Sequence, residues 1–411
     1  MKIAFVTSSL HGGGITSYAH EVVDCFASKH EMSVVVGDDS QNPFDNSKVK
    51  VYRCESNDKS IDNARKLLRL INNEIKPDVV INSNSELMTL VLPFIENSIR
   101  YVTVSHSLRY NEADNAGINS RYADRLVALS TYNEEYLRKQ YHIDNPEKVK
   151  VIYNFVDELE NSVSLRLQKV KQTPLRIVYA GGTSAAKTPE LVFDVLVQLL
   201  KTDREFEFIF MGSNSPTSHK IQPYKSITEL IEPDSRVKFT GRVSRQEAEQ
   251  IISSANIFLV PSRREGCPMA MLEAMRVGCI VITSDYKNAC REMITDGKSG
   301  FMIPNNNKQA FVERIIDIID HHDSYTSFYQ ACYEEFESRF SFPHWRKRMV
   351  ELISDGKLLH EERIEGFSEE QYTKMRRRMD CRKKYNLVHM LLHEKIKSTM
   401  SFYFKYFRKK L

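Results

Sequence analysis

Cysteine is scarce in this 411-residue sequence, and its seven cysteines form no Cys-x-x-Cys pair. Such an odd, scattered set argues against a disulfide framework and a zinc knuckle, and it is typical of a reducing compartment. Long hydrophobic runs are also missing. No stretch of about 18 uninterrupted apolar residues occurs, so no membrane-spanning helix is predicted. The apolar run at the N-terminus is too short for a signal peptide, and we therefore expect a cytoplasmic protein.

Acidic residues are nearly absent from the C-terminal end. From Lys374 onward the sequence has 13 Lys and Arg residues against two acidic residues, a net charge of +11, whereas the whole chain carries only +4. The rest of the chain is therefore mildly acidic, at −7. The basic excess belongs to one terminal segment.

Short β-branched runs alternate with amphipathic stretches through most of the chain, which predicts parallel sheets covered by helices on both faces. The alternation stops around residues 157–174, where charged residues take over, and then restarts. We therefore predict an α/β protein with two Rossmann-like domains that face each other across a cleft, followed by a basic helical extension. The predicted bounds are 1–160 and 161–340 for the domains, 341–356 for a helix crossing back to the first domain, and 357–411 for the tail.

Individual elements can be placed on this pattern. Ser244 and Glu247 have the spacing of a capping box, and Pro189 suits the first turn of a helix. Helices are expected over 15–29, 61–75, 188–201, 244–255 and 268–277. Strands are expected over 2–8, 32–38, 49–54, 78–83, 100–106, 124–130 and 149–154 in the first domain, and over 175–182, 206–213, 236–241, 257–262, 279–285 and 300–304 in the second.

Two glutamates stand eight residues apart in 257-IFLVPSRREGCPMAMLEAM-275. We expect Glu265 in the exit loop of a buried strand, a helix whose first turn contains Pro268, and Glu273 further along that helix. Ligands of such sheets bind at the carboxyl ends of the strands, and a helix N-terminus attracts anions. One carboxylate on each side of an anion site suits the two sugars of a nucleotide-sugar. From the residues alone, two solvated surface glutamates are the alternative interpretation.

Eight short motifs follow one another along roughly residues 1–355. They are 11-HGGG, 104-VSHS, 127-VALSTYNEEYL, 151-VIYNFVD, 179-YAGGTSAAKT, 239-FTGRVSRQE, 261-PSRREGCPMAMLEAM and 297-GKSGFMIP. In this order they resemble the motifs of the GT-B glycosyltransferases of family 4, which are retaining and depend on a nucleotide-sugar. The fold and activity of that family are therefore what the resemblance implies for this chain.

The resemblance implies a donor site in the second domain. Glu273 would bind the ribose hydroxyls, and Glu265, with a catalytic role, would bind hydroxyls of the transferred sugar. The backbone between them would face the donor, and because proline has no N–H, the donating amides there must be those of its neighbours. The donor-binding positions of this stretch are Gly266, Cys267, Pro268 and Met269.

Lys187 and His106 complete the implied catalytic set. Lys187 would lie on the diphosphate, where charge develops as the leaving group departs. His106, at the end of a first-domain strand, would face the transferred sugar. Gly12, Gly13 and Gly14 would allow the backbone to approach the donor phosphate and the acceptor closely. Without the resemblance, a surface lysine, a core histidine and a flexible turn are the alternatives.

The sequence departs from the family at one donor-binding position. The family usually has an arginine five residues before the lysine, and here Gly182 stands in its place. A lost transition-state contact of this kind costs on the order of 3 kcal/mol. Either activity is low, or another cation substitutes for the bidentate arginine. Arg263 and Arg264, which leave the same strand end, rank ahead of Arg242 as the substitute.

No Asp-x-Asp motif occurs, which argues against a metal clamp on the diphosphate. The resemblance likewise implies transfer with retention and without a metal or other cofactor, the departing phosphate helping to deprotonate the acceptor hydroxyl. A double displacement with two carboxylates stays open from the sequence. A UDP-sugar is favoured over a GDP-sugar as the donor. The expected acceptor is a glycan or a lipid-linked glycan, as in bacterial surface-polysaccharide synthesis.

Two other functions stay open. Gly182 also fits a catalytically weakened protein that binds a sugar nucleotide as the partner of another enzyme. An NAD(P)-dependent oxidoreductase is less well supported. Gly12, Gly14 and Asp38 form the skeleton of a dinucleotide-binding fingerprint, but Ser17 stands at its third glycine.

Apolar residues recur at helical spacing in the tail, with basic residues beside them. Such a helix can lie in an anionic membrane surface, where each basic residue contributes roughly 1 kcal/mol. We therefore expect peripheral association with the inner face of the cell membrane, and a helix packed on the first domain is the alternative. Nucleic-acid binding is not expected, because the acidic body offers no supporting face. The apolar positions are Val388, Leu392, Ile396, Met400, Tyr403 and Phe407.

Overall fold

The structure is a computed structural model that describes residues 1–10, 14–38, 44, 49–55, 57–106, 110–181, 185–212, 234–305 and 307–384. Contacts divide the chain into two compact units. Unit 1 contains Met1–Ala128, Tyr136–Lys150 and the residues from Gly356 on. Unit 2 contains Leu129–Glu135 and Val151–Asp355. The predicted domain boundary near residue 160 falls later than this division, and the segment predicted as a separate crossover helix is grouped with unit 2.

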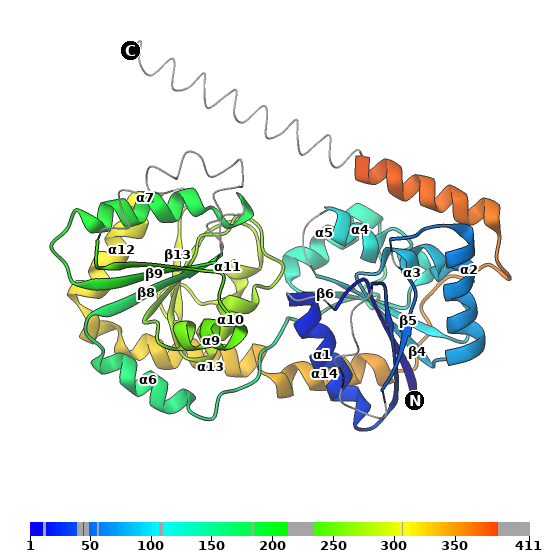
Figure 1. The fold of residues 1–411 in the computed structure, drawn as a ribbon, viewed down its shortest axis with the longest axis horizontal. Helices are drawn as coiled ribbons and strands as arrows, with labels where there is room; N and C mark the ends of the chain where they lie inside the picture. Colours follow the sequence, from blue (N-terminus) through cyan, green and yellow to red (C-terminus); the bar gives the residue numbers. More distant parts are fainter. Residues whose placement is uncertain are drawn as a thin grey trace, which may run out of the picture. The chain divides into compact units, whose positions relative to one another are not determined.

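Unit 1 is built on a parallel sheet of seven strands in the order β3-β2-β1-β4-β5-β6-β7 (Figure 1). Helix α1 covers one face of this sheet, and α2 to α5 pack with the core residues of the other face. The strands are β1 (Lys2–Thr7), β2 (Glu31–Val36), β3 (Val49–Arg53), β4 (Val79–Ser83), β5 (Arg100–Ser105), β6 (Arg125–Ala128) and β7 (Val149–Val151). The helices are α1 (Gly14–Ala27), α2 (Ile61–Arg69, continued by a π-helical turn Leu70–Ile75), α3 (Glu86–Val91), α4 (Tyr110–Gly117) and α5 (Thr131–Tyr141).

Unit 2 repeats this plan with six parallel strands in the order β10-β9-β8-β11-β12-β13. Figure 1 shows α7 and α12 on one face of its sheet and α9, α10 and α13 on the other. The strands are β8 (Leu175–Ala180), β9 (Phe206–Met211), β10 (Val237–Gly241), β11 (Ile257–Val260), β12 (Ile280–Ser284) and β13 (Gly300–Ile303). The helices are α6 (Ser162–Lys171), α7 (Pro189–Leu200), α9 (Arg245–Ser253), α10 (Met269–Arg276), α11 (Ala289–Met293), α12 (Lys308–Asp320), α13 (Thr326–Phe340) and α14 (Phe342–Ser354).

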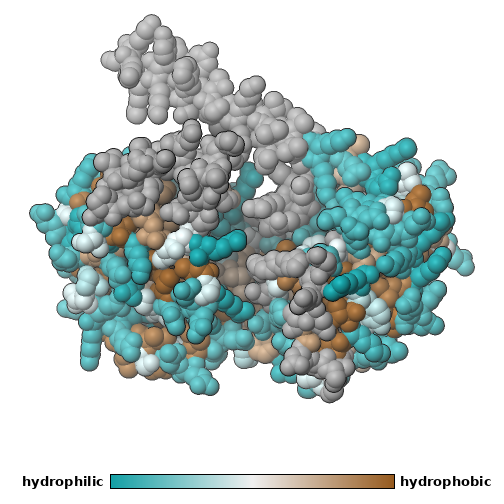
Figure 2. All heavy atoms as spheres, in the orientation of Figure 1, coloured by the Kyte–Doolittle hydropathy of each residue, from teal (hydrophilic) through white to brown (hydrophobic). Residues whose placement is uncertain are grey.

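Both sheets confirm the predicted fold class. Every predicted strand is present, and central strands such as β4, β5 and β12 are buried along their whole length. That burial explains their near-continuous apolar sequences, because helices cover both faces of a parallel sheet. On the face seen in Figure 2, hydrophilic residues cover most of the surface and hydrophobic residues show in small patches between them.

The predicted helix starts are partly right. Ser244 and Glu247 form the reciprocal bonds of a capping box at the start of α9, and Pro189 is the first residue of α7. Pro268 was predicted in the first turn of a helix, but its ψ of 117° is extended, and it is the N-cap of α10. The helix therefore begins at Met269, one residue later than expected.

Residues after Gly356 are built into unit 1. The carboxylate of Asp124, at the start of β6, is fully buried and accepts hydrogen bonds from the backbone amide of Leu359 (2.7 Å) and from Nδ1 of His360 (2.8 Å). A helix over residues 369–384, orange to red in Figure 1, then packs on the same unit. Tyr372 and Met379 on this helix join the hydrophobic core of unit 1.

The rest of the tail, residues 385–411 with all six apolar positions of the predicted amphipathic helix, lies outside the described residues.

Candidate active site

The neighbouring strands β8 and β11 mark the point where the strand order of unit 2 reverses. In open parallel sheets, ligands bind outside the carboxyl ends of the strands at such a point. One loop leaves β8 and reaches a 3-10 turn, Ala185–Lys187, and another leaves β11 and reaches α10. The amide of Arg263 donates to the carbonyl of Ala186 (2.8 Å), which ties the two loops together. The two loops therefore form a continuous surface at the switch point.

Lys187 and Glu265 meet on this surface. Nζ of Lys187 lies 2.5 Å from Oε1 of Glu265, whose side chain is only 9% exposed, while that of Lys187 is 31% exposed. The lysine offsets the cost of burying the carboxylate. Lys187, the predicted phosphate-binding cation, is therefore in direct contact with Glu265, the predicted sugar-binding carboxylate, although the two residues are far apart in sequence.

Side chains that the sequence did not single out hold this pair in position. Asn288, the N-cap of α11, donates from Nδ2 to the carbonyl of Ser262 (2.8 Å). The next amide, that of Ala289, donates to the backbone carbonyl of Glu265 (3.3 Å). On the other loop, the hydroxyl of Tyr179 donates to the carbonyl of Lys187 (3.3 Å). The backbone of both charged residues is therefore fixed before a ligand arrives.

The stretch Gly266–Met269 connects Glu265 to α10. Gly266, Cys267 and Pro268 are buried and Met269 is half-buried. Nδ2 of Asn154 donates to the carbonyl of Cys267 (2.9 Å). Burial raises the pKa of the Cys267 thiol to about 12, so it stays protonated and is no nucleophile. The first amides of α10 have no carbonyl partner within the helix, so they can donate to an anion.

Glu273 lies within α10, is half-buried, and makes no hydrogen bond or ion pair with any residue that the structure describes. Burial raises the pKa of its carboxyl, an effect that the nearby charges of Arg276 and Arg245 partly offset and that of Glu249 adds to. Such a carboxylate is costly unless a ligand supplies donors. Its predicted role, binding the ribose hydroxyls of a donor, stays a prediction.

In unit 1, His106 directly follows β5, and its Nε2 shares a hydrogen bond of 2.8 Å with the hydroxyl of Ser83 at the end of β4. The ring of Tyr18 from α1 contacts the imidazole edge to face, with the centroids 5.0 Å apart. Burial lowers the pKa of His106 to about 4, so the imidazole is neutral at pH 7. A neutral imidazole can donate or accept one hydrogen bond to a sugar, and Ser83 fixes which nitrogen does so.

Comparison with known sequences decides the family. The profile described as "Glycosyltransferase Family 4" matches residues 12–158, and "Glycosyl transferases group 1" matches residues 165–335, so together they cover most of the chain. The chain belongs to the group 1 glycosyltransferases of family 4 type. It is therefore a glycosyltransferase.

Individual relatives are distant. The O-antigen biosynthesis glycosyltransferase WclY of Escherichia coli is 26% identical over 298 residues, which are 69% of this chain and 80% of that protein. The putative colanic acid biosynthesis glycosyltransferase WcaL of Salmonella typhimurium is 24% identical over 216 residues, about half of each protein (51%). The crystal structure of Anabaena HepE in complex with UDP superposes with a TM-score of 0.68 at 16% identity, covering 86% of this chain and all of HepE. At that identity the likeness shows the fold.

The remaining predicted residues of the glycosyltransferase fall into two groups. Gly12, Gly13 and Gly182 lie outside the described residues, and Gly14 is the first residue of α1. Among the cations, Arg263 pairs with Glu190 of α7 (3.3 Å). The exposed side chains of Arg264 and Arg242 have no hydrogen bond or ion pair with the described part of the chain. Of the two arginines in the loop that carries Glu265, Arg264 is therefore the one without a partner among the described residues.

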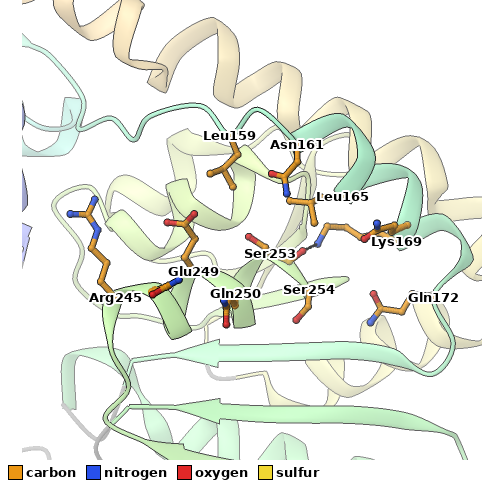
Figure 3. Close-up of a pocket in the computed structure, with 12 residues that line it drawn as sticks. Leu159, Asn161, Leu165, Lys169, Gln172, Arg245, Glu249, Gln250, Ser253 and Ser254 are labelled. Carbon is orange, nitrogen blue, oxygen red and sulfur yellow. Dashed lines mark hydrogen bonds between the residues drawn. The ribbon is translucent and has the colours of Figure 1, made fainter.

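A cavity of about 640 Å³ lies elsewhere in unit 2, between α6 and α9 (Figure 3). Figure 3 shows Lys169 reaching from α6 to the carbonyl of Ser253, a hydrogen bond of 2.6 Å. The cavity contains none of the predicted site residues, and we do not place the donor in it. Arg245 and Glu249 at its wall are nevertheless, with Arg276, among the residues whose charges act on Glu273.

In the part of the chain that the structure describes, no helix has both the length and the apolar character that crossing a bilayer requires. The same residues contain no group of three or more His, Cys, Asp or Glu side chains placed to hold a metal ion.

Proposed function

We propose that this glycosyltransferase moves a sugar from a nucleotide-sugar, with UDP as the favoured nucleotide, to a glycan or lipid-linked glycan. The transfer retains the anomeric configuration and uses no metal. The observation that carries this proposal is the carboxylate of Glu273, which has no hydrogen-bond or ion-pair partner among the described residues and lies in the helix that follows the Lys187–Glu265 pair. A nucleotide-sugar contains, in this order, a ribose diol for Glu273, a diphosphate for the start of α10 and Lys187, and a sugar for Glu265.

Each predicted role has a physical basis in unit 2. Glu273 accepts both ribose hydroxyls, which provides the donors that its half-buried carboxylate lacks. The amides at the start of α10 and the ammonium of Lys187 bind the diphosphate. Glu265 then exchanges part of its contact with Lys187 for hydroxyls of the transferred sugar. Arg264 takes the place of the arginine that Gly182 replaces.

In the transfer itself, the bond between the anomeric carbon and the phosphate oxygen breaks, and a bond from the acceptor oxygen to that carbon forms on the same face. The acceptor proton moves to the departing phosphate oxygen. Lys187 stabilises the charge that builds up on the leaving diphosphate, a contact worth about 10²–10³ in rate in comparable sites. The neutral imidazole of His106 in unit 1 contacts the transferred sugar.

The relatives support the substrate classes. HepE is described in complex with UDP and with UDP-glucose, and WclY is named for O-antigen biosynthesis. By analogy we assign this enzyme to bacterial surface-polysaccharide synthesis. The basic tail then serves to hold the enzyme on the inner face of the membrane, where a lipid-linked acceptor is found.

Thermal stabilisation by UDP, GDP and their sugars, without added metal, tests the donor, because a ligand of the folded state raises the melting temperature. We expect a shift with the UDP series and slow hydrolysis of one UDP-sugar, whose anomeric product NMR can identify. Lys187→Met should lose turnover, and it should also lower the melting temperature without ligand, because it leaves the buried carboxylate of Glu265 without this cation. A shift with NAD(P) alone would refute the proposal, and nucleotide-sugar binding without any turnover would identify a weakened binding protein.

A further inference from the structure

Unit 1 contains a second cavity, of about 350 Å³, at the edge of its sheet opposite the end of β5 that carries His106. Helices α4 and α5 start after the carboxyl ends of β5 and β6, so their C-terminal ends reach the opposite edge. There they meet the helix over residues 369–384. Among the residues that line the cavity are Arg121, Tyr141, His142, Met375, Arg378 and Arg382.

The lining of this cavity is basic. It includes three arginines and one histidine, and no acidic side chain belongs to it. The nearby Asp114 is fully buried and already engaged. It accepts hydrogen bonds from Nε of Arg382 (2.9 Å) and from the hydroxyl of Tyr141. Among the described residues, only Arg382 of these arginines has an acidic partner, so Arg121 and Arg378 add positive charge that no described side chain compensates.

Capping of helix ends does not explain these arginines. Arg138 serves the carbonyls after α5, including those of Asn145 (2.9 Å) and Pro146 (3.0 Å). The guanidinium of Arg121 gives one hydrogen bond, to the hydroxyl of Tyr122 (2.8 Å). Arg378 is exposed and has no hydrogen bond or ion pair with any described residue. With five N–H donors on each guanidinium, most donors at this cavity are unused.

We propose that this cavity binds a phosphate group. A guanidinium group can donate two parallel hydrogen bonds to two oxygens of a phosphate. Several guanidinium groups line this cavity, which is large enough for a phosphate ester. Tyr141 and Met375 offer apolar contacts to the carbon part of such an ester. The cavity lies wholly in unit 1, away from the strand ends, so the proposal does not depend on the transfer reaction.

Two sources can supply such a phosphate, an anionic phospholipid headgroup or a soluble phosphate compound. The wall formed by residues 375–382 belongs to the helix that opens the basic tail. Lys374, Arg377 and Lys384 are exposed on that helix but do not line the cavity. Substitutions at these residues can serve as controls. They distinguish specific phosphate binding in the cavity from the general attraction between a basic helix and any anion.

The test uses the full chain and two variants of equal charge. Arg121→Gln/Arg378→Gln removes two cations from the cavity, whereas Arg377→Gln/Lys384→Gln removes two from outside it. Titration with inorganic phosphate and glycerol phosphate, at constant ionic strength so that screening is equal, should show saturable binding by the wild type and the control variant. The cavity variant should bind about tenfold more weakly.

Vesicles of phosphatidylglycerol and phosphatidylcholine then separate the two sources. A lipid headgroup site predicts that the cavity variant loses vesicle binding while the control keeps most of it. A site for soluble phosphate predicts equal losses on vesicles and a difference only with the free phosphates. Absence of saturable phosphate binding, or equal weakening in both variants, would overturn the proposal. Equal melting temperatures of the three proteins would show that folding is not the cause.

Discussion

Replacing Glu273 with glutamine should separate donor binding from folding. The carboxylate is half-buried without a hydrogen-bond or ion-pair partner among the described residues, and burial raises its pKa. Because the pKa of Glu273 is higher in the folded state than in the unfolded state, protonation of this carboxyl stabilises the folded protein. This stabilisation is complete below the pKa of the unfolded state and is lost as the pH rises through the pKa of the folded state. At pH 7 the neutral amide avoids this cost. Glu273→Gln should therefore fold as stably as the wild type, or more so.

Donor affinity should move in the opposite direction. Hydrogen bonds to a charged group contribute about 1.5–3 kcal/mol each, and glutamine keeps one acceptor oxygen. A net loss of about 2 kcal/mol corresponds to roughly a 30-fold increase in the Kd for the nucleotide. At a ligand concentration of about 100 times the wild-type Kd, ligand stabilisation is about 2.7 kcal/mol in the wild type and should fall to about 0.9 kcal/mol in the variant.

Melting curves with and without the nucleotide, at pH 5 and pH 7, measure both effects. Because burial raises the pKa of Glu273, wild-type affinity for the nucleotide should decrease as the pH is lowered, and the variant should lack this pH dependence. Glu249→Gln is the matched control, because Glu249 lies near the same arginine, 3.6 Å from Arg276, and has no predicted contact with the donor. A Glu273→Gln protein that binds the nucleotide as tightly as the wild type would refute the assigned site.

Three further substitutions test other parts of the molecule. Ser83→Ala removes the hydrogen-bond partner of His106. If this costs about 1.4 kcal/mol of transition-state stabilisation, kcat should decrease about tenfold with little change in the donor KM. An equal change in kcat and KM would point to misfolding. Asn154→Ala removes the hydrogen bond to the carbonyl of Cys267, and we expect about a fivefold increase in the donor KM. An unchanged donor KM in steady-state kinetics would contradict this expectation. Asp124→Asn should lower the free energy of unfolding by about 3–5 kcal/mol in denaturant titrations. Burial alone raises the pKa of Asp124, but the hydrogen bonds to its carboxylate lower the pKa overall. The contribution of Asp124 to the free energy of unfolding should therefore disappear as the pH falls below the ordinary aspartate pKa of about 4.

Much of the fold could be read from local sequence because buried parallel strands need nearly continuous apolar runs. The glycosyltransferase site was harder. Lys187 and Glu265 were each predicted to contact the donor, but their mutual contact depends on two loops that meet only through the strand order. Asn154 belongs to a predicted motif, yet nothing in its sequence neighbourhood indicates that it holds the carbonyl of Cys267.

The segment after Gly356 shows where charge patterns mislead. Its acidic and basic residues are typical of a solvated stretch, but Arg363 is only 4% exposed. Its guanidinium donates to the carbonyls of Glu96 (2.8 Å) and Ile99 (2.7 Å). A charged side chain can be buried when backbone carbonyls of a distant segment accept its hydrogen bonds, and no local pattern reveals those carbonyls.

The anchoring of this segment on Asp124 determines where the protein can be shortened. The amide of Leu359 and the imidazole of His360, which serve the buried carboxylate, both follow Asp355. A chain cut at Asp355, next to the boundary predicted between the crossover helix and the tail, would leave Asp124 without these donors and would uncover the apolar surface beneath Tyr372 and Met379. A cut after Lys384 removes residues 385–411 and keeps both. The region that looks like an appendage in the sequence therefore begins inside the folded body of unit 1.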